Sequence, residues 1–303
     1  MKKIFFIAVF IAAALNTYAQ SVPSLNISAD PYAMSMGGVS LTLEQNAFTL
    51  GSNSSSMAFS ESKFHLGGSY GLWQPDYMKN NNIGFSTYGV SKRAAFGIAG
   101  KMFGYQPYEV INSDGVQNGT FTPMELSVEG AFAYRISKCL SAGVNVRGIS
   151  SKLAEEASAM TVAADVSVTY RNENFTIAAA VTNIGGSLDY GTSTKYSLPS
   201  MAKIGAGYAF IGYYSVFRIN VEGDYLMNKS AIMAGIGGEY SFRDIIKLRA
   251  GYHVGSENAI PTYYSAGLGL QLGFFNLDAA YIFGGNNDPV LNGSFGLACG
   301  IRF

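Results

Sequence analysis

Charged side chains are the residues of this sequence best placed to do chemistry, and they follow a strict spacing. In seven of the segments expected to be strands, thirteen acidic and basic residues share one parity, and none falls on the apolar parity. Successive side chains of a strand point to opposite faces, so this spacing gathers the charge on one face of a sheet. The thirteen residues are Glu125, Glu129, Arg135, Asp165, Arg171, Arg218, Glu222, Asp224, Glu239, Lys247, Arg249, Asp278 and Arg302.

Histidine and cysteine, which carry most metal-site and nucleophilic chemistry, are scarce. There are two of each, which leaves little for a zinc site or a disulfide framework. His65 and His253 fall on the polar parity of their segments, and we expect each to be a hydrogen-bonding residue rather than part of a joint site. The sequence shows no local pattern for a serine, histidine and aspartate triad. We therefore predict a protein without enzyme activity, cofactor or bound metal.

Composition narrows the class of protein further. Charged residues are 13% of the chain, against about 25% in an ordinary soluble domain, while aromatic residues reach 14%. Lys and Arg together equal Asp and Glu at 20 each, so no basic surface is expected to attract nucleic acid. Beyond the N-terminus no uncharged apolar run is long enough for a transmembrane helix. These values favour a β-rich protein with much apolar surface.

One unit repeats from Lys63 to Phe303: about ten residues of alternating character followed by a break. Period-two alternation is the signal of a strand with two different faces. Fourteen such segments are expected: Lys63–Leu72, Asn82–Ser91, Ala94–Tyr105, Met124–Ile136, Leu140–Leu153, Ser158–Arg171, Phe175–Ile184, Ser200–Phe210, Val216–Leu226, Ile232–Phe242, Ile246–His253, Tyr263–Leu272, Phe275–Phe283 and Ser294–Phe303.

The breaks between these segments alternate in length, and this separates two β architectures. A soluble sandwich would also alternate apolar and polar residues, so alternation alone does not exclude it. Long breaks such as Gln106–Pro123 and Gly185–Pro199, either of which could hide a further strand, alternate with short ones such as Lys92-Arg93. Outer-membrane barrels have this asymmetry, with short periplasmic turns and long external loops.

We therefore predict an all-β fold: a transmembrane antiparallel β-barrel of about fourteen strands over residues 63–303, in contact with outer-membrane lipid. Closure leaves no unpaired sheet edge in the bilayer. The final Phe303 resembles the C-terminal aromatic signal that the outer-membrane assembly machinery reads, so this machinery is an expected partner.

The N-terminus has the features of a secretory signal peptide over residues 1–19. Lys2-Lys3 form a short positive region, and Ile4–Leu15 are uninterrupted apolar residues. Small residues then precede an expected cleavage between Ala19 and Gln20. A membrane-anchored N-terminus is the alternative, although the apolar run is short for a helix that spans a bilayer.

Residues 20–62, between this leader and the first strand, lack the alternation of the rest. They carry turn and breaker residues, among them Asp30-Pro31, Gly37-Gly38 and a serine-rich run after Gly51. A short apolar stretch, Ala33–Met36, lies among them. We expect this segment to form a plug in the lumen, with a disordered periplasmic tail as the alternative.

The charged parity of the strands is expected to face the lumen. It carries six positive and seven negative residues, which predicts a nearly neutral interior crossed by salt bridges. Buried charges must be paired or hydrated, so the simplest role of these residues is structural. The structural prediction covers Glu125, Glu129, Arg135, Asp165, Arg218, Glu222, Asp224, Glu239, Lys247, Arg249, Asp278 and Arg302.

The stretch Asp30–Ser40 resembles the N-terminal motif of the PorV/PorQ family and, more distantly, of the FadL-type long-chain fatty acid transporters. Ser69–Trp73 is similar to the Ser-Tyr-x-x-Trp that ends the first strand of PorV-like chains. The Asn-Pro-Ala of these families is replaced by Asn53-Ser54-Ser55. The plug motif suggested by the resemblance comprises Met34, Met36, Gly37, Gly38 and Asn53.

The resemblance implies a fourteen-stranded FadL-like barrel and a place in type IX secretion, where PorV-like proteins accept secreted cargo and pass it to surface attachment. The leading hypothesis is a non-enzymatic component or shuttle of this kind, with secreted cargo or secretion components as partners. Gln106–Pro123 and Gly185–Pro199 would carry the contacts. The alternatives are a FadL-like transporter of hydrophobic small molecules and a structural barrel of unknown partner.

Overall fold

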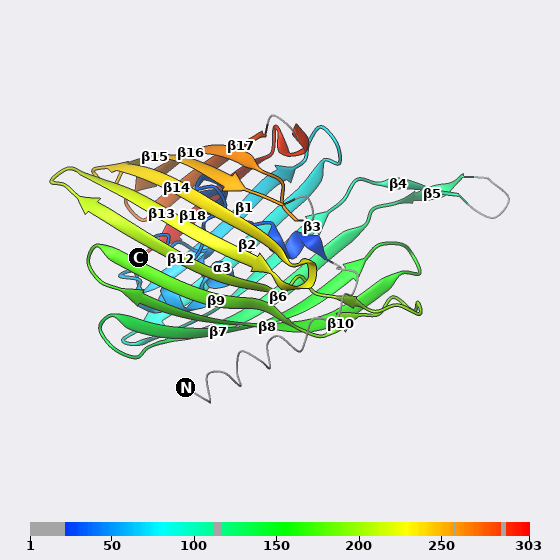
Figure 1. Cartoon of the computed structure of the whole chain (residues 1–303), viewed down its shortest axis with the longest axis horizontal. Helices are drawn as coiled ribbons and strands as arrows, with labels where there is room; N and C mark the ends of the chain where they lie inside the picture. The colour runs from blue at the N-terminus through cyan, green and yellow to red at the C-terminus, as the bar shows by residue number, and fades with distance from the viewer. Residues whose placement is uncertain (1–21, 112–116, 257–258, 286–288) are drawn as a thin grey trace.

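Fourteen strands close into one antiparallel barrel around the N-terminal segment in this structure, a computed structural model (Figure 1). The structure describes residues 22–111, 117–256, 259–285 and 289–303. The leader and the cleavage site expected at Ala19 and Gln20 therefore lie outside the described residues. The barrel confirms the predicted all-β, antiparallel architecture of about fourteen strands.

The first and last wall strands pair with each other, from His65 opposite Arg302 to Leu72 opposite Phe295, and this pairing closes the sheet. All other neighbours in the wall are also antiparallel. The wall strands are β1 (Phe64–Trp73), β2 (Asn80–Ser91), β3 (Ala94–Gly104), β6 (Met124–Arg135), β7 (Leu140–Lys152), β8 (Ser158–Arg171), β9 (Phe175–Gly185), β12 (Met201–Ile211), β13 (Ser215–Leu226), β14 (Ala231–Phe242), β15 (Ile246–Val254), β16 (Tyr263–Leu272), β17 (Phe275–Gly284) and β18 (Phe295–Arg302).

The apolar parity of the wall faces outward. On three neighbouring strands Val128, Val146 and Val162 are 58%, 56% and 59% exposed, values that would be anomalous for valine in a soluble core. Charged residues of the same strands face the interior. This inverted pattern is that of a barrel whose outer surface meets lipid.

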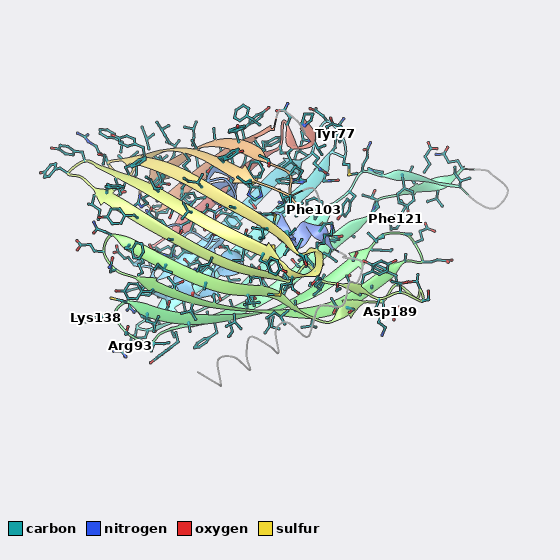
Figure 2. The ribbon with its side chains drawn as sticks, viewed as in Figure 1. Tyr77, Arg93, Phe103, Phe121, Lys138 and Asp189 are labelled. Atoms are coloured by element: carbon teal, nitrogen blue, oxygen red, sulfur yellow. The ribbon has the colours of Figure 1, made fainter. Side chains whose placement is uncertain are left out.

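The two ends of the barrel differ. Figure 2 shows Arg93 and Lys138 at the end that carries the short turns, and Tyr77, Phe121 and Asp189 at the opposite end. The sequence left room for extra strands in the two longest breaks, and each break holds a separate two-stranded sheet. These are β4 (Tyr108–Ile111) with β5 (Gln117–Phe121), and β10 (Ser187–Leu188) with β11 (Tyr196–Ser197). Neither pair joins the wall, so the number of barrel strands stays at fourteen.

Residues 22–62, which we call the plug, form short helical pieces inside the barrel: η1 (Pro23–Asn26), α2 (Pro31–Ser35), α3 (Thr49–Ser52) and η2 (Ser54–Phe59). Asp30 caps α2, because its side chain accepts a hydrogen bond from the Tyr32 N–H (3.0 Å), and Pro31 occupies the first turn. Gly37 and Gly38 follow with φ of 70° and 80°, which ends the helix as only glycine does easily.

Two more helical turns, η3 (Met227–Lys229) and η4 (Pro289–Leu291), lie in the breaks of the wall. Among the residues that the structure describes, no helix has the length and apolar character needed to cross a bilayer.

Candidate functional site

The turn Met36-Gly37-Gly38 lies against the inner face of the wall and is held by two of its side chains. The Gly37 N–H donates to Ser265 Oγ (3.1 Å), and His253 Nδ1 lies 3.2 Å from the Gly37 carbonyl oxygen that accepts from it. His253 is therefore a lumen hydrogen-bonding residue, as its parity predicted. His65 is the second such residue, since its Nε2 lies 2.7 Å from Ser60 Oγ at the end of the plug.

Wall glycines make room for this turn. A Cβ atom on Gly251 would lie 2.0 Å from the Gly37 nitrogen, and one on Gly237 would lie 2.6 Å from the Met36 oxygen. Both contacts are with backbone atoms, which cannot move aside as a flexible side chain can. The inward glycines of β14 and β15 therefore allow the plug backbone at Met36 and Gly37 to pack directly against the wall backbone.

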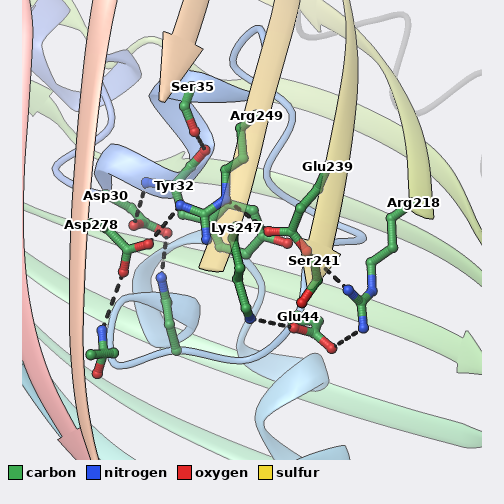
Figure 3. Close-up of polar contacts among 12 residues, drawn as sticks. Asp30, Tyr32, Ser35, Glu44, Arg218, Glu239, Ser241, Lys247, Arg249 and Asp278 are labelled. Carbon is green, nitrogen blue, oxygen red and sulfur yellow. Dashed lines mark hydrogen bonds and ion pairs between the residues drawn. The ribbon is translucent and has the colours of Figure 1, made fainter. Parts of the chain in front are cut away.

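Glu44 ties the plug to the wall by charge (Figure 3). Its carboxylate pairs with Arg218 on β13 and with Lys247 on β15, where the Nζ to Oε2 distance is 2.9 Å. Burial by itself would raise the pKa of Glu44, but the attraction of Lys247 and Arg218 outweighs burial and lowers the pKa to about 2. The single carboxylate of Glu44 therefore forms ion pairs with two wall strands, β13 and β15.

From Glu44 the ion pairs continue across the wall. Arg218 Nη1 lies 3.0 Å from Glu239 Oε1, and Arg249 Nε lies 2.8 Å from Glu239 Oε2. Arg249 Nη1 also lies 2.6 Å from Asp278 Oδ1, and its guanidinium stacks over the Tyr32 ring of the plug at 3.8 Å. Glu239 is fully buried with a cation on each side, so protein side chains neutralise its charge.

A second ionic group joins the plug to β12 and β13. Glu222 accepts hydrogen bonds from the backbone N–H groups of Ser40 (2.8 Å) and Leu41 (2.7 Å), and from Lys203 Nζ (2.7 Å). Lys203 Nζ also lies 3.8 Å from Asp224 Oδ1. One wall carboxylate thus binds the plug backbone directly while a wall lysine balances its charge.

A third group lies within the wall. Arg147 Nη2 lies 2.6 Å from Glu129 Oε2 and 3.1 Å from Asp165 Oδ2, and Arg147 Nη1 donates to Asn183 Oδ1 (2.6 Å). Asn183 has a φ of 56° at the point where the pairing of β8 and β9 shifts register, and its own N–H donates to Asp165 Oδ1 (2.6 Å). This bulge is fixed by the same charges that face the lumen.

At the start of the plug, Ser24 donates to Glu125, and the Glu125 carboxylate also accepts from the Tyr105 hydroxyl (2.9 Å). Lys101 donates to the carbonyl oxygens of Ser24 and Ile27. Glu125 therefore makes its hydrogen bonds to uncharged groups, and the nearby cation serves the plug backbone.

The serine-rich run replaces the Asn-Pro-Ala of the resembling families and is bound along its length. Asn53 Nδ2 donates to the Leu41 oxygen (2.6 Å) and to Thr169 Oγ1 (2.9 Å). The Ser55 N–H donates to Ser167 Oγ (3.0 Å), and Ser141 Oγ donates to the Ser55 oxygen (2.8 Å). Inward hydroxyls of β7 and β8 thus supply partners for a plug segment that has little regular structure of its own.

Three of the thirteen predicted charges lie apart from these groups. Arg135 donates to the Lys92 oxygen (2.9 Å) at the short-turn end, and Arg171 donates to Gln45 of the plug (2.6 Å). Arg302 lines a small cavity beside Glu44, and among the described residues it joins none of the ion pairs. Their part in a lumen network remains a prediction.

Four charged residues of the network were absent from the sequence prediction: Glu44, Lys101, Arg147 and Lys203. The three basic residues sit on the inward parity of β3, β7 and β12, so the alternation that revealed the others could have found them. Glu44 had no such signal, because it lies in a segment without alternation.

Little space remains between the plug and the wall. One lumen cavity between plug and wall has a volume of about 150 Å³, and its lining includes Lys101, Glu129, Arg147, Asp165 and Lys203. An aliphatic cavity of this size stays dry and can hold benzene, whereas charged walls require water. Within the described residues no group of three His, Cys, Asp or Glu side chains could hold a metal ion.

The model of the family described as "Type IX secretion system protein PorV" matches residues 11–230, which is most of the chain. The chain belongs to the PorV family. No curated protein matches the sequence closely enough to count as a relative. Family and fold together make this an outer-membrane β-barrel protein linked to type IX secretion.

Solved structures support the fold over nearly the whole chain. The Ralstonia pickettii toluene transporter TbuX shares 14% identity, with 90% of this chain and 98% of that one covered at a TM-score of 0.63. The Pseudomonas putida toluene transporter TodX shares 12% identity, with 89% and 97% covered at a TM-score of 0.67. The monoaromatic hydrocarbon channel CymD shares 11% identity, with 96% and 99% covered at a TM-score of 0.62. At these identities the likeness concerns the fold alone.

Proposed function

We propose that this PorV-family barrel is a non-enzymatic binding station for exported proteins, working at its long-loop end rather than through its lumen. The observation that carries the proposal is the contrast between that end and the interior. The lumen is occupied by a plug held by ionic groups and backbone contacts. The long-loop end instead presents exposed apolar side chains, such as Tyr77 (55%) and Ile111 (63%).

The experiment removes the two longest loops separately from the full-length protein in cells that use type IX secretion. One variant lacks residues 107–122 and the other lacks residues 186–198. We expect either deletion to lower the amount of exported protein at the cell surface several-fold. Heat-modifiable migration on a gel, a property of folded barrels, is the control that the wall is intact. Unchanged surface delivery by both deletion variants would refute the proposal.

A FadL-like conduit for hydrophobic small molecules is the second candidate, and the fold neighbours favour it. TbuX and TodX are toluene transporters, and CymD is a monoaromatic hydrocarbon channel. The charged lining of the lumen cavity speaks against an apolar ligand in this chain. Uptake of labelled toluene into liposomes that carry the protein separates the two functions, and we expect no rate above that of empty liposomes.

A further inference from the structure

The two-stranded ribbon β4–β5 reaches further than the other strand pairs on the long-loop end and, like β10–β11, forms a sheet separate from the wall. Figure 1 shows it projecting from the barrel well beyond the neighbouring loops. Its strands pair only with each other among the described residues, with Tyr108 opposite Phe121 and Glu109 opposite Thr120. Both outer edges therefore present backbone N–H and C=O groups that no neighbouring strand uses.

The ribbon is fixed at its base, so its edges are presented in a defined place. The Tyr108 hydroxyl donates to the Leu153 oxygen (3.1 Å), and the Tyr108 and Phe121 rings lie 5.7 Å apart. Lys152 Nζ lies 5.4 Å from the centre of the Phe121 ring. These contacts tie the base of the ribbon to the end of β7 and to the loop that follows it.

Open edges are normally blunted by lysine, proline or charges that point inward, because an exposed edge invites another strand. The described strands of this ribbon contain neither lysine nor proline. The two prolines of the loop, Pro107 and Pro123, flank the ribbon where it leaves the wall. Lysine and proline are thus absent along the described strands, where the pairing shifts register once, between Glu109 and Ile111.

We propose that one of the two outer edges of β4–β5 binds an extended segment of an exported polypeptide as a third strand. A strand is the occupant that matches a row of alternating donors and acceptors, and main-chain hydrogen bonds of this kind recur in peptide recognition. Glu109 is the sole charged residue of the two described strands, and Ile111 is 63% exposed. The segment that fits is therefore neutral or basic and rich in β-branched residues. This inference rests on the proposed function and names its partner.

The in vitro test uses the full-length protein in detergent and a fluorescent peptide of alternating valine, threonine and lysine residues. Two further peptides carry N-methyl groups at the odd or at the even positions, which removes donors from one edge at a time. We expect the unmethylated peptide to bind and at least one methylated peptide to bind tenfold more weakly or worse. Equal binding of all three peptides, or no binding of the unmethylated peptide at millimolar concentration, would overturn the proposal.

Variants of the protein supply the matched comparison. Glu109 lies on one outer edge of the ribbon and Thr120 on the other, so at least one of Glu109→Pro and Thr120→Pro should abolish peptide binding, because proline removes a backbone donor and breaks the ladder. Thr120→Ala and Glu109→Ala keep the backbone donors and should retain binding to within threefold. In cells the proline variant that loses peptide binding should lower surface delivery and the alanine variants should not.

The outcomes separate this inference from the proposed function. Deletion of residues 107–122 that lowers delivery, together with proline and alanine variants that behave alike, would keep the loop as a contact site and reject strand addition. Unchanged delivery in both loop-deletion variants would reject the binding station itself, while the peptide measurement still decides whether the edge can accept a strand.

Discussion

The lumen and the β4–β5 ribbon differ in whether their polar groups have partners within the protein. In the lumen, Glu239 is fully buried between Arg218 and Arg249, and Glu222 binds two plug N–H groups. In the ribbon, Glu109 is the sole charged residue of the described strands, and the backbone groups on the two outer edges pair with no neighbouring strand. Satisfied polar groups fix one arrangement, whereas unsatisfied edges leave room for a partner. Stability therefore depends on the lumen, and the proposed contact with exported protein lies at the ribbon.

The largest effect on stability is expected when Glu239, which pairs with both Arg218 and Arg249, loses its charge. Glu239→Gln leaves two buried guanidinium groups without their shared counter-charge, and we expect a loss of about 3–5 kcal/mol in the free energy of unfolding. Urea unfolding in detergent, followed by heat-modifiable migration, measures it. Glu155→Gln, at an exposed loop carboxylate, is the matched control and should change stability by less than about 0.5 kcal/mol. Equal stability of the two variants would mean that water hydrates the lumen charges.

The ion pairs of Glu44 predict that the stability of the protein falls at acidic pH. Its pKa is lowered by Lys247 and Arg218 to about 2, so its contribution is fully present above the unfolded value of 4.5 and is lost as the pH falls from 4.5 through 2. The contribution is on the order of 3 kcal/mol. The difference in stability between wild type and Glu44→Gln should therefore shrink across that pH window. A difference that stays constant down to pH 2 would contradict the pairing.

Backbone contact between plug and wall should be the next most sensitive feature. Gly251→Ala places a methyl group against the Gly37 backbone, and overpacking of this kind costs about 1–3 kcal/mol. Limited proteolysis should then cleave the plug faster than in wild type. Gly223→Ala is the control, because a Cβ there meets nothing within 4 Å. Similar cleavage rates for the two variants would show that the plug does not depend on close backbone approach.

The smallest effect on stability is expected at the ribbon. Ile111→Lys adds charge to an exposed edge position and should leave the unfolding free energy within about 0.5 kcal/mol of wild type. The same variant should weaken binding of the basic alternating peptide. A large loss of stability would show that the ribbon contributes to the stability of the barrel, and would contradict the assignment of stability to the lumen alone.

The degree to which the site was predictable follows from where each residue lies. Glu129, Asp165 and Arg249 were found because each lies in a strand with clean alternation, and Lys101, Arg147 and Lys203 were available to the same argument. Glu44 could not be found, because it lies in the plug and its role depends on which wall strands approach it. The likeness of Met36-Gly37-Gly38 to a family motif marked the plug but gave no sign of the glycines that receive it.

What the sequence determined by itself is the wall. Period-two alternation is a local property, so it set the strands, the lipid-facing side and the inward charges, and the alternating lengths of the breaks set the two ends of the barrel. Only the tertiary structure decided which charges meet. Closure of the barrel brings β13, β14 and β15 around one stretch of plug, and partners separated by up to 203 residues come within 3 Å. Ion pairs and backbone contacts of that kind depend on distance in space, which spacing along the chain does not encode.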